Sequence, residues 1–256
     1  KLFPDDIEGM GVLGSCLRAS GDINESLKHL DRAIELNPNY TEALINRGLI
    51  QVSQEDKSGA VSDLEKAHHL KPHIKQIWDL VLSLKMELEE FEDAISIAEE
   101  MVKIDPFNEK TFEAMALCYQ YLADFEKAIE AYNKAISIKP DYFEAWVDLG
   151  TTLREYGKLD ESIEAYSKAI SIKPDFAEVH NNMGTTLKEH GKLDEALEAY
   201  DKALSIKPDY AEAYNNVTET LKIFSPNKNK SHILFSNDKR IKILSKRLIN
   251  SKSDKK

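Results

Sequence analysis

Seven of the eight prolines in this 256-residue chain stand 34 residues apart. They occupy positions 4, 38, 72, 106, 140, 174 and 208, and only Pro226 lies outside the series. A fixed spacing of this length indicates a structural unit that is repeated along the chain. The spacing therefore predicts a solenoid, in which each unit packs on its sequence neighbours.

Within each unit, the apolar residues follow the pattern of two amphipathic helices. In residues 143–176, one apolar set recurs at the i, i+3 and i+7 spacing of a helix face: Trp146, Leu149 and Leu153. Gly157 interrupts this pattern, and a second apolar face follows: Ile163, Tyr166, Ala169 and Ile170. Pro174 then ends the second helix, because proline lacks the backbone N–H and clashes with the preceding turn.

These helix pairs predict an all-α solenoid. Its six full repeats are 7–40, 41–74, 75–108, 109–142, 143–176 and 177–210. Pro4 ends a still earlier unit, so residues 1–6 are expected to be the end of a preceding repeat. Residues 211–224 carry the pattern of the first helix of a seventh repeat.

Residues 225–256 form a basic tail. Ile241, Leu244 and Leu248 stand there at helical spacing, and we expect a helix at about 238–250 to cap the apolar end of the last repeat. The alternative is a helix that binds a membrane surface or nucleic acid.

Glycine recurs at the eighth place of four repeats, as Gly14, Gly48, Gly150 and Gly184. A glycine inside a helix costs about 1 kcal/mol relative to alanine. Its recurrence therefore predicts that the paired helix crosses there, closer than a side chain would permit. A second small position recurs in the second helices, at Ala33, Ala67, Ala135, Ala169 and Ala203.

Four first helices are preceded by pairs with the spacing of a capping box. The pairs are Asp141 with Glu144, Asp175 with Glu178, Asp209 with Glu212, and Asn39 with Glu42. In a capping box, the first side chain accepts a hydrogen bond from the backbone N–H three residues later, and the glutamate reaches back. We therefore expect these pairs to fix where each first helix begins.

Two segments resemble the tetratricopeptide-repeat family, whose unit also has 34 residues: AWVDLGTTLREYGKLDESIEAYSKAISIKPDF and NNMGTTLKEHGKLDEALEAYDKALSIKPDY. The resemblance covers residues 7–210 and implies a right-handed superhelix of helix-turn-helix repeats. The second and third repeats depart from the pattern and are expected to be less regular. Leu82 stands there where glycine is usual, and Lys85 where an apolar residue is usual.

In this family, the outer surface of the first helices lines a concave groove that holds an extended peptide or a partner helix. The resemblance places the sixth residue of each repeat on the groove: Val12, Asn46, Leu80, Ala114, Asp148, Asn182 and Asn216. Neighbouring groove residues are Asn181, Asn215, Thr151, Thr185, Arg154 and Lys188, and Leu117 and Tyr121 add an apolar stretch.

The asparagines of the groove resemble the ladder in the repeats of protein O-GlcNAc transferases. An amide both donates and accepts hydrogen bonds, so it can hold a peptide backbone without reading its side chains. The predicted peptide-binding residues are Asn46, Asp148, Asn181, Asn182, Asn215, Asn216, Arg154 and Lys188. The alternative is that they are ordinary polar surface residues of a consensus repeat.

Other sets that suggest chemistry are better explained by structure. Gly9, Gly11 and Gly14 match the dinucleotide motif G-x-G-x-x-G, which needs a preceding strand, but here the motif lies inside a predicted helix. Pro72 separates His68 and His69 from His73, and no nearby cysteine completes a zinc site. We expect no cofactor and no metal, and we find no catalytic set.

We expect one histidine and both cysteines to be packed in the core. His180 takes the place that Trp146 and Tyr214 occupy in their repeats, so we expect it to pack. Cys16 and Cys118 occupy the same place three repeats apart, too distant for a disulfide, and both are expected to be small buried residues.

Charge and composition limit the partners. The net charge is −11, and the tail carries ten Lys/Arg and two Asp (+8), so residues 1–224 carry −11 − 8 = −19. This acidic body argues against nucleic acid and is compatible with a basic partner. No apolar run is long enough for a membrane span. Two cysteines favour a reducing compartment, and we expect a cytoplasmic location.

The sequence thus predicts a non-enzymatic scaffold that binds a protein or peptide. We expect a monomer, or weak self-association through the ends of the repeat array. The alternative is the substrate-recruiting repeat region of a larger enzyme, of the glycosyltransferase or sulfotransferase type, whose catalytic domain lies outside this chain. The full-length reading frame would distinguish the two.

Overall fold

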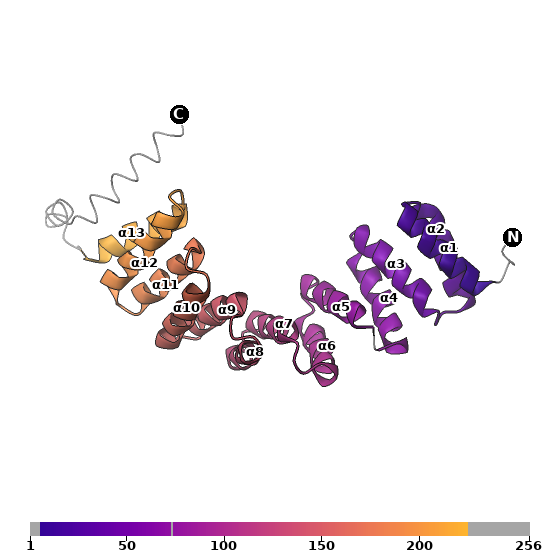
Figure 1. The fold of residues 1–256 in the computed structure, drawn as a ribbon, viewed down its shortest axis with the longest axis horizontal. Coiled ribbons are helices and arrows are strands. Elements are labelled where there is room, and N and C mark those ends of the chain that lie inside the picture. The colour runs from indigo at the N-terminus through magenta and orange to yellow at the C-terminus, as the bar shows by residue number, and fades with distance from the viewer. Residues whose placement is uncertain (1–5, 73, 225–256) are drawn as a thin grey trace, which may run out of the picture. The chain divides into compact units, whose positions relative to one another are not determined.

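The computed structural model describes residues 6–72 and 74–224. These residues form thirteen α-helices and no strand (Figure 1). The helices of the first three repeats are α1 (Ile7–Ser20), α2 (Ile23–Leu36), α3 (Thr41–Ser53), α4 (Lys57–Leu70), α5 (Lys75–Glu87) and α6 (Phe91–Ile104). The others are α7 (Glu109–Tyr121), α8 (Phe125–Ile138), α9 (Phe143–Glu155), α10 (Leu159–Ile172), α11 (Ala177–Glu189), α12 (Leu193–Ile206) and α13 (Ala211–Phe224).

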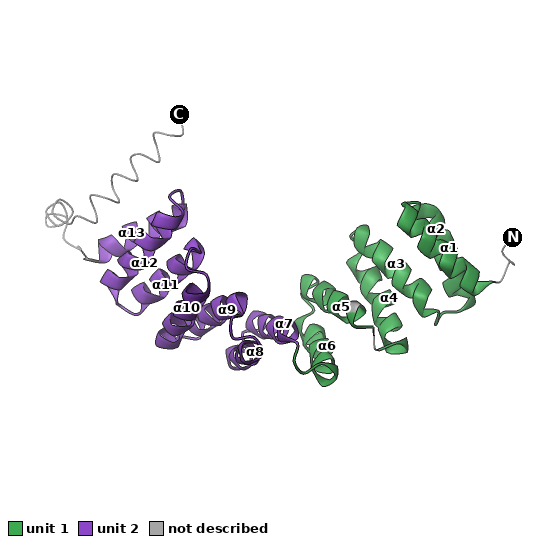
Figure 2. Ribbon diagram, viewed as in Figure 1, with its two compact units in different colours: residues 1–107 green, residues 108–256 purple. Residues whose placement is uncertain are grey.

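The chain divides into two compact units, which Figure 2 distinguishes by colour. The first unit, residues 1–107, holds α1 to α6, and the second, residues 108–256, holds α7 to α13. Odd-numbered helices are the first helices of their repeats, and even-numbered helices are the second helices. The proposed tail helix, His73 and residues 1–5 lie outside the described residues.

The glycine expectation is confirmed. A Cβ added to Gly150 would lie 2.7 Å from the Tyr166 ring, and one added to Gly184 would lie 2.6 Å from the Tyr200 ring. Gly14 and Gly48 approach Leu30 and Leu64 in the same way. The five recurring alanines of the second helices are also completely buried: Ala33, Ala67, Ala135, Ala169 and Ala203.

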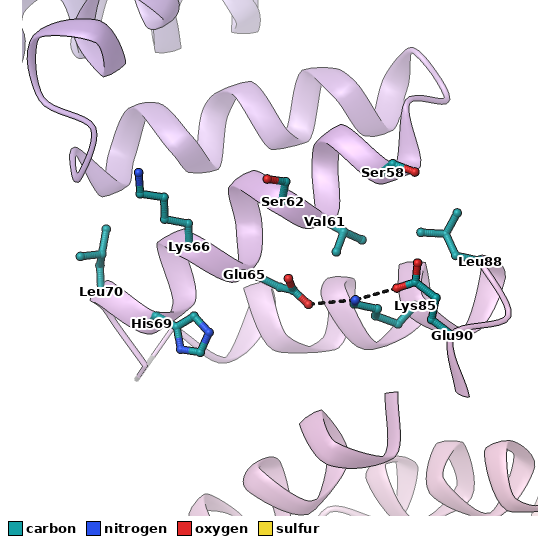
Figure 3. A pocket seen from close by; sticks show the side chains of 10 residues that line it. All are labelled: Ser58, Val61, Ser62, Glu65, Lys66, His69, Leu70, Lys85, Leu88 and Glu90. Atoms are coloured by element: carbon teal, nitrogen blue, oxygen red, sulfur yellow. Dashed lines mark hydrogen bonds and ion pairs between the residues drawn. The ribbon is translucent and has the colours of Figure 1, made fainter. Parts of the chain in front are cut away.

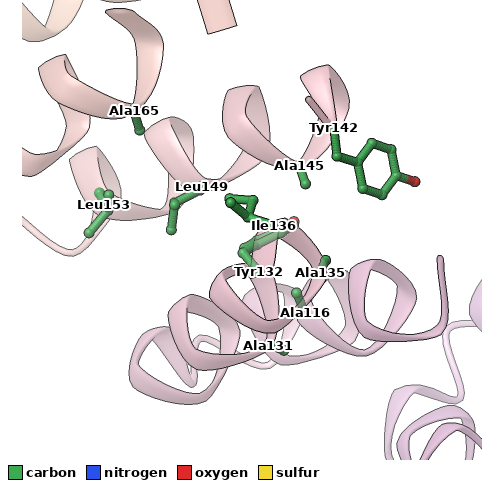
Figure 4. Close-up of a cluster of buried hydrophobic side chains, with 10 residues drawn as sticks. All are labelled: Ala116, Ala131, Tyr132, Ala135, Ile136, Tyr142, Ala145, Leu149, Leu153 and Ala165. Atoms are coloured by element: carbon green, nitrogen blue, oxygen red, sulfur yellow. The ribbon is translucent and has the colours of Figure 1, made fainter. Parts of the chain in front are cut away.

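The two remaining hairpins carry other residue pairs at these places. In the third repeat, buried Leu82 replaces the glycine, and the second-helix place of Tyr166 holds the completely buried Ala98. In the fourth repeat, the corresponding pair is Ala116 and Tyr132, both completely buried (Figure 4). Protein interiors are close-packed, and in the third repeat the bulk added on the first helix is removed from the second.

The expectation of capping boxes is wrong for three of the four first helices. The cap positions of α3, α9 and α11 are Tyr40, Tyr142 and Phe176, and none makes a side-chain capping bond. The preceding Asn39, Asp141 and Asp175 therefore stand one residue too early to act as the cap. The glutamates instead bind the lysine that precedes the proline of their own repeat: Glu144 accepts from Lys173 (2.9 Å) and Glu178 from Lys207 (3.0 Å).

The turns between repeats are closed by a recurring hydrogen bond. The fourth residue of a first helix bonds the carbonyl of the proline that follows the preceding helix. Trp78 Nε1 donates to Pro72 O (3.0 Å), and Trp146 Nε1 donates to Pro140 O (3.0 Å). His180 Nε2 lies 2.9 Å from Pro174 O, and its side chain is buried. The packing role expected for His180 is therefore confirmed.

The two cysteines differ, and one expectation is wrong. Cys118 is completely buried, but Cys16 is exposed. Their common place is buried in every later described repeat. Within the second unit, for example, Thr186 at this place lies 3.5 Å from Ser162 on the second helix of the repeat before. Cys16 belongs to the first described repeat, so no described helix covers this face.

The size exchange in the hairpins predicts the outcome of a double-mutant cycle. Gly150→Leu should destabilise the protein by about 1–3 kcal/mol through overpacking, and Tyr166→Ala should cost about 3–5 kcal/mol through the cavity it leaves. The combination recreates the natural Leu82–Ala98 pair, so it should cost clearly less than the sum. Urea denaturation of the three variants measures this, and additive costs would contradict the exchange.

Candidate functional site

The predicted peptide-binding residues of the second unit lie on its first helices, α9, α11 and α13. We use the name first-helix surface for one set of residues. It comprises the fifth, sixth, ninth and twelfth places of α7, α9, α11 and α13. Side chains link neighbouring first helices along it. Gln120 donates to Glu155 (3.2 Å) between α7 and α9, and Asn216 donates to Asn181 (3.0 Å) between α11 and α13.

The asparagines of this surface fall into two groups. Asn181 is completely buried: its Oδ1 accepts from Asn216, and its Nδ2 donates to Glu212 (3.0 Å). These amides therefore hold α11 and α13 together. Asn182 is half-buried and Asn215 is exposed, and neither amide has a hydrogen bond within the described chain. Asn182 and Asn215 are the amides that a ligand can use.

The two predicted cations are engaged in ion pairs between repeats. Arg154 Nη1 lies 3.2 Å from Glu189 Oε1, and Lys188 Nζ lies 3.7 Å from Glu219 Oε2. Both side chains are well covered, with exposed fractions of 28% and 19%. These cations therefore neutralise neighbouring carboxylates before any ligand arrives.

Asp148 is the unusual group of this surface. Its carboxylate is half-buried, and burial, together with the nearby Glu113 and Glu144, raises its pKa to about 6. Burial also raises the pKa of Glu113, which accepts a hydrogen bond from the Tyr142 hydroxyl. Asp148 itself has no cationic partner within the described chain. Asp148 therefore lacks a counter-charge of its own, whereas the nearby Glu144 is paired with Lys173.

Asn46, the remaining predicted residue, belongs to the first unit. Its Oδ1 accepts from Arg18 Nε (3.0 Å), and its Nδ2 donates to the carbonyl of Glu42 (2.8 Å). The amide is therefore used within the repeats. Val12, at the sixth place of α1, is 63% exposed.

The alternative chemistries gain no support from the described chain. The G-x-G-x-x-G motif lies within α1. His68 packs on the Trp78 ring at 3.5 Å between centroids, and no group of three metal-ligating side chains occurs among residues 6–72 and 74–224. None of the described helices has the length and apolarity that a membrane span needs.

Sequence reasoning missed two acidic clusters. One is the group of Glu113 and Glu144 around Asp148. The other surrounds Lys85, which bonds Glu90 (2.6 Å), Asp93 (3.0 Å) and Glu65 (3.2 Å). The signal for the second was present, because a lysine at an apolar place needs carboxylates nearby to be buried.

Family models agree with the helix pattern. One model, described as TPR repeat, matches residues 14–55 and 150–191, and two described as tetratricopeptide repeat match residues 110–142 and 177–210, and residues 131–164. The chain belongs to the tetratricopeptide-repeat family. Tetratricopeptide repeats typically serve as protein-interaction scaffolds and usually carry no catalytic residues.

One curated relative is a UDP-N-acetylglucosamine–peptide N-acetylglucosaminyltransferase from Giardia intestinalis, 31% identical over 87 residues. The match covers 30% of this chain and only 6% of that enzyme. It is consistent with the resemblance to the repeats of O-GlcNAc transferases.

Solved structures share the fold. MamA is 26% identical with a TM-score of 0.62, and the match covers 67% of this chain and 94% of MamA. YrrB, described as a TPR protein with an unusual peptide-binding site, is 22% identical with a TM-score of 0.60. That match covers 73% of this chain and 96% of YrrB, and at this identity it shows the fold alone.

The raised pKa of Asp148 predicts a pH-dependent stability effect. The folded protein disfavours the charged form of Asp148. The charged carboxylate therefore lowers the stability progressively as the pH rises from 3.8, the ordinary pKa of an aspartate, to about 6, the pKa in the folded protein, and the full cost is present above that pH. Asp148→Asn should therefore stabilise the protein at pH 8, by up to about 3 kcal/mol, and should have little effect at pH 4. Urea denaturation at the two pH values measures this, and equal effects would contradict it.

Proposed function

We propose that the first-helix surface of the second unit binds a segment of a partner protein that carries positive charge. The observation that carries this proposal is Asp148, a half-buried carboxylate among other carboxylates, without a counter-charge in the described chain. The corresponding places of neighbouring repeats hold Ala114, Asn182 and Asn216, so the repeat fold does not require a charge there. A residue that costs stability without a structural need is typical of a functional site.

A bound ammonium or guanidinium group supplies the missing counter-charge. It lowers the pKa of Asp148 again, because an opposite charge within a few ångströms favours the ionised carboxylate. Asn182 and Asn215 can hold the peptide backbone beside it through their unused amides. Binding should therefore strengthen as the pH rises through 6, in the range where the free carboxylate ionises.

Labelled octapeptides test this proposal. A peptide of alternating lysine and serine should bind more tightly than its glutamate counterpart in fluorescence anisotropy at low salt. Asp148→Asn should weaken binding about fivefold or more, and Asn182→Ala should cost about 1 kcal/mol. The matched control is Asp194→Asn, which removes the same charge from an exposed place on α12.

Two results would contradict the proposal. The first is equal weakening by Asp148→Asn and Asp194→Asn, which would indicate general attraction to the acidic body. The second is binding that does not respond to pH between 5 and 7.5. Asn216→Ala is less informative, since it also removes the partner of Asn181.

The second candidate function is substrate recruitment within a larger enzyme. The match to the glycosyltransferase of Giardia intestinalis favours it. The first-helix surface would then bind the protein substrate, and the same peptide experiment applies. A catalytic domain in the full reading frame would decide for this candidate. The cytoplasmic location, the monomeric or weakly self-associating state and the absence of nucleic-acid binding stay predictions.

A further inference from the structure

The joint between the second and third repeats, within the first unit, contains an open depression of about 520 Å³. Its walls come from α4 and α5 and from the turn that leads to α6 (Figure 3). Val61, Leu70 and Leu88 supply apolar surface. Glu65 and Glu90 both point at Lys85 (Figure 3).

A smaller cavity of about 100 Å³ adjoins the depression, because Glu65 and His69 line both. The other lining residues are His68, Trp78, Val81, Ser96, Ile97 and Glu100. His68 is 7% exposed, and its buried Nδ1 has no hydrogen-bond partner in the described chain. We call the two spaces together the joint cleft.

The charges of the joint cleft favour a cation. Lys85 is surrounded by three carboxylates, so this cluster has a net charge of 1 − 3 = −2. Lys66, which also lines the depression, adds one positive charge. Glu100 adds a carboxylate to the smaller cavity. Burial, reinforced by His69, lowers the pKa of His68, so its ring is neutral and does not repel a cation. The smaller cavity therefore combines negative charge with three aromatic rings, those of His68, His69 and Trp78.

We propose that the joint cleft is a second docking site, whose small cavity takes the arginine side chain of a partner segment. Apolar neighbours of that arginine would lie on Val61, Leu70 and Leu88 in the depression. This site lies in the first unit and stands independently of the first-helix surface of the second unit.

Arginine fits this cavity better than lysine. Its guanidinium is planar, stacks on aromatic rings and donates to carboxylates along two directions at once. Trp78 supplies an aromatic ring, and Glu65 and Glu100 supply acceptors. A lysine ammonium is a compact, strongly hydrated charge that would lose more hydration in so small a space.

The chain contains its own control for this proposal. The corresponding joint of the fourth and fifth repeats, in the second unit, has a depression of about 200 Å³ that is lined in part by Trp146. There, Asn133 stands in the place of Glu65, and Lys168 in the place of Glu100. Glu161 and Glu164 also line this depression, so its charged residues sum to 1 − 2 = −1, against −2 for Glu65 and Glu100 in the smaller cavity. With a lysine in its lining and less negative charge, this joint should bind arginine more weakly.

Trp78 provides the signal for a test, since Trp78 and Trp146 are the two tryptophans of the chain. Trp146→Phe leaves Trp78 as the only tryptophan, and phenylalanine occurs naturally at this place as Phe112. The probes are acetyl-Leu-Arg-Val-amide and its citrulline and lysine versions, titrated at pH 7.5 into the full chain. Citrulline keeps the shape of arginine and removes its charge.

We expect the arginine peptide to change Trp78 fluorescence with a dissociation constant on the order of 1 mM or below. The lysine version should bind several-fold more weakly, and the citrulline version should not bind measurably. Glu100→Gln should weaken arginine binding about fivefold or more, and added salt should weaken it further. The matched control Lys168→Gln, at the corresponding place of the other joint, should leave binding unchanged.

Three results would each overturn the proposal. The first is no response to the arginine peptide at several times that concentration, with circular dichroism showing an intact fold. The second is equal binding of the arginine and citrulline peptides. The third is binding that Glu100→Gln leaves unchanged. Because the probes report on Trp78, failure here leaves the proposal for the first-helix surface untouched.

Discussion

The distance at which the two helices of a repeat approach each other is set by one pair of side chains, and the other contacts depend on it. The pair stands at the eighth and twenty-fourth places, as in Gly150 and Tyr166. In the second unit, a tyrosine at the twenty-fourth place crosses the core and brings its hydroxyl to the first helix. Tyr166 Oη lies 2.9 Å from Thr151 Oγ1, and Tyr132 donates to Gln120 (3.2 Å). In these repeats, the tyrosine hydroxyl thus connects the packed core to the first-helix surface.

The 34-residue period stays constant in part because a hydrogen bond in each turn between repeats joins two residues at a fixed sequence separation. The proline carbonyl has no intrahelical partner, because the helix has already ended, and the fourth residue of the next helix bonds it. Trp146, His180 and Tyr214 all span six residues in this way. An insertion between the proline and the next helix would break this bond and move the following helix. The proline spacing is therefore maintained by the turn as well as by helix length.

The sequence predicted the helices, the close crossings and the role of His180, because each depends on periodicity within one repeat. The sequence could not predict which of several possible partners a polar side chain would bind. Glu144 has the spacing of a capping box but binds Lys173, since an opposite charge is within reach and the cap falls one residue later. Asn181 and Asn182 are adjacent and chemically identical, yet only Asn181 is buried. Which amide remains available depends on how α11 and α13 pack, and no single repeat encodes that.

The two units join successive repeats by different chemistry. In the first unit, Arg47 binds Asp63 through two nitrogens (2.6 and 2.7 Å) and reaches Asp31 of the preceding repeat (2.8 Å). Lys85 reaches Glu65 of its preceding repeat in the same way. The second unit has apolar side chains at the places of these cations, among them Leu149 and Leu153, both buried.

Buried ion pairs often add little net stability compared with apolar packing, but losing one partner costs about 3–5 kcal/mol. Part of the charge that compensates these cations comes from the preceding repeat, through Asp31 beside Arg47 and Glu65 beside Lys85. Lys85 also binds Glu90 and Asp93 of its own repeat, so Glu65 is one of three carboxylates that neutralise it. Because Glu65 also lines the joint cleft, the acid that joins the second repeat to the third contributes negative charge to that cleft.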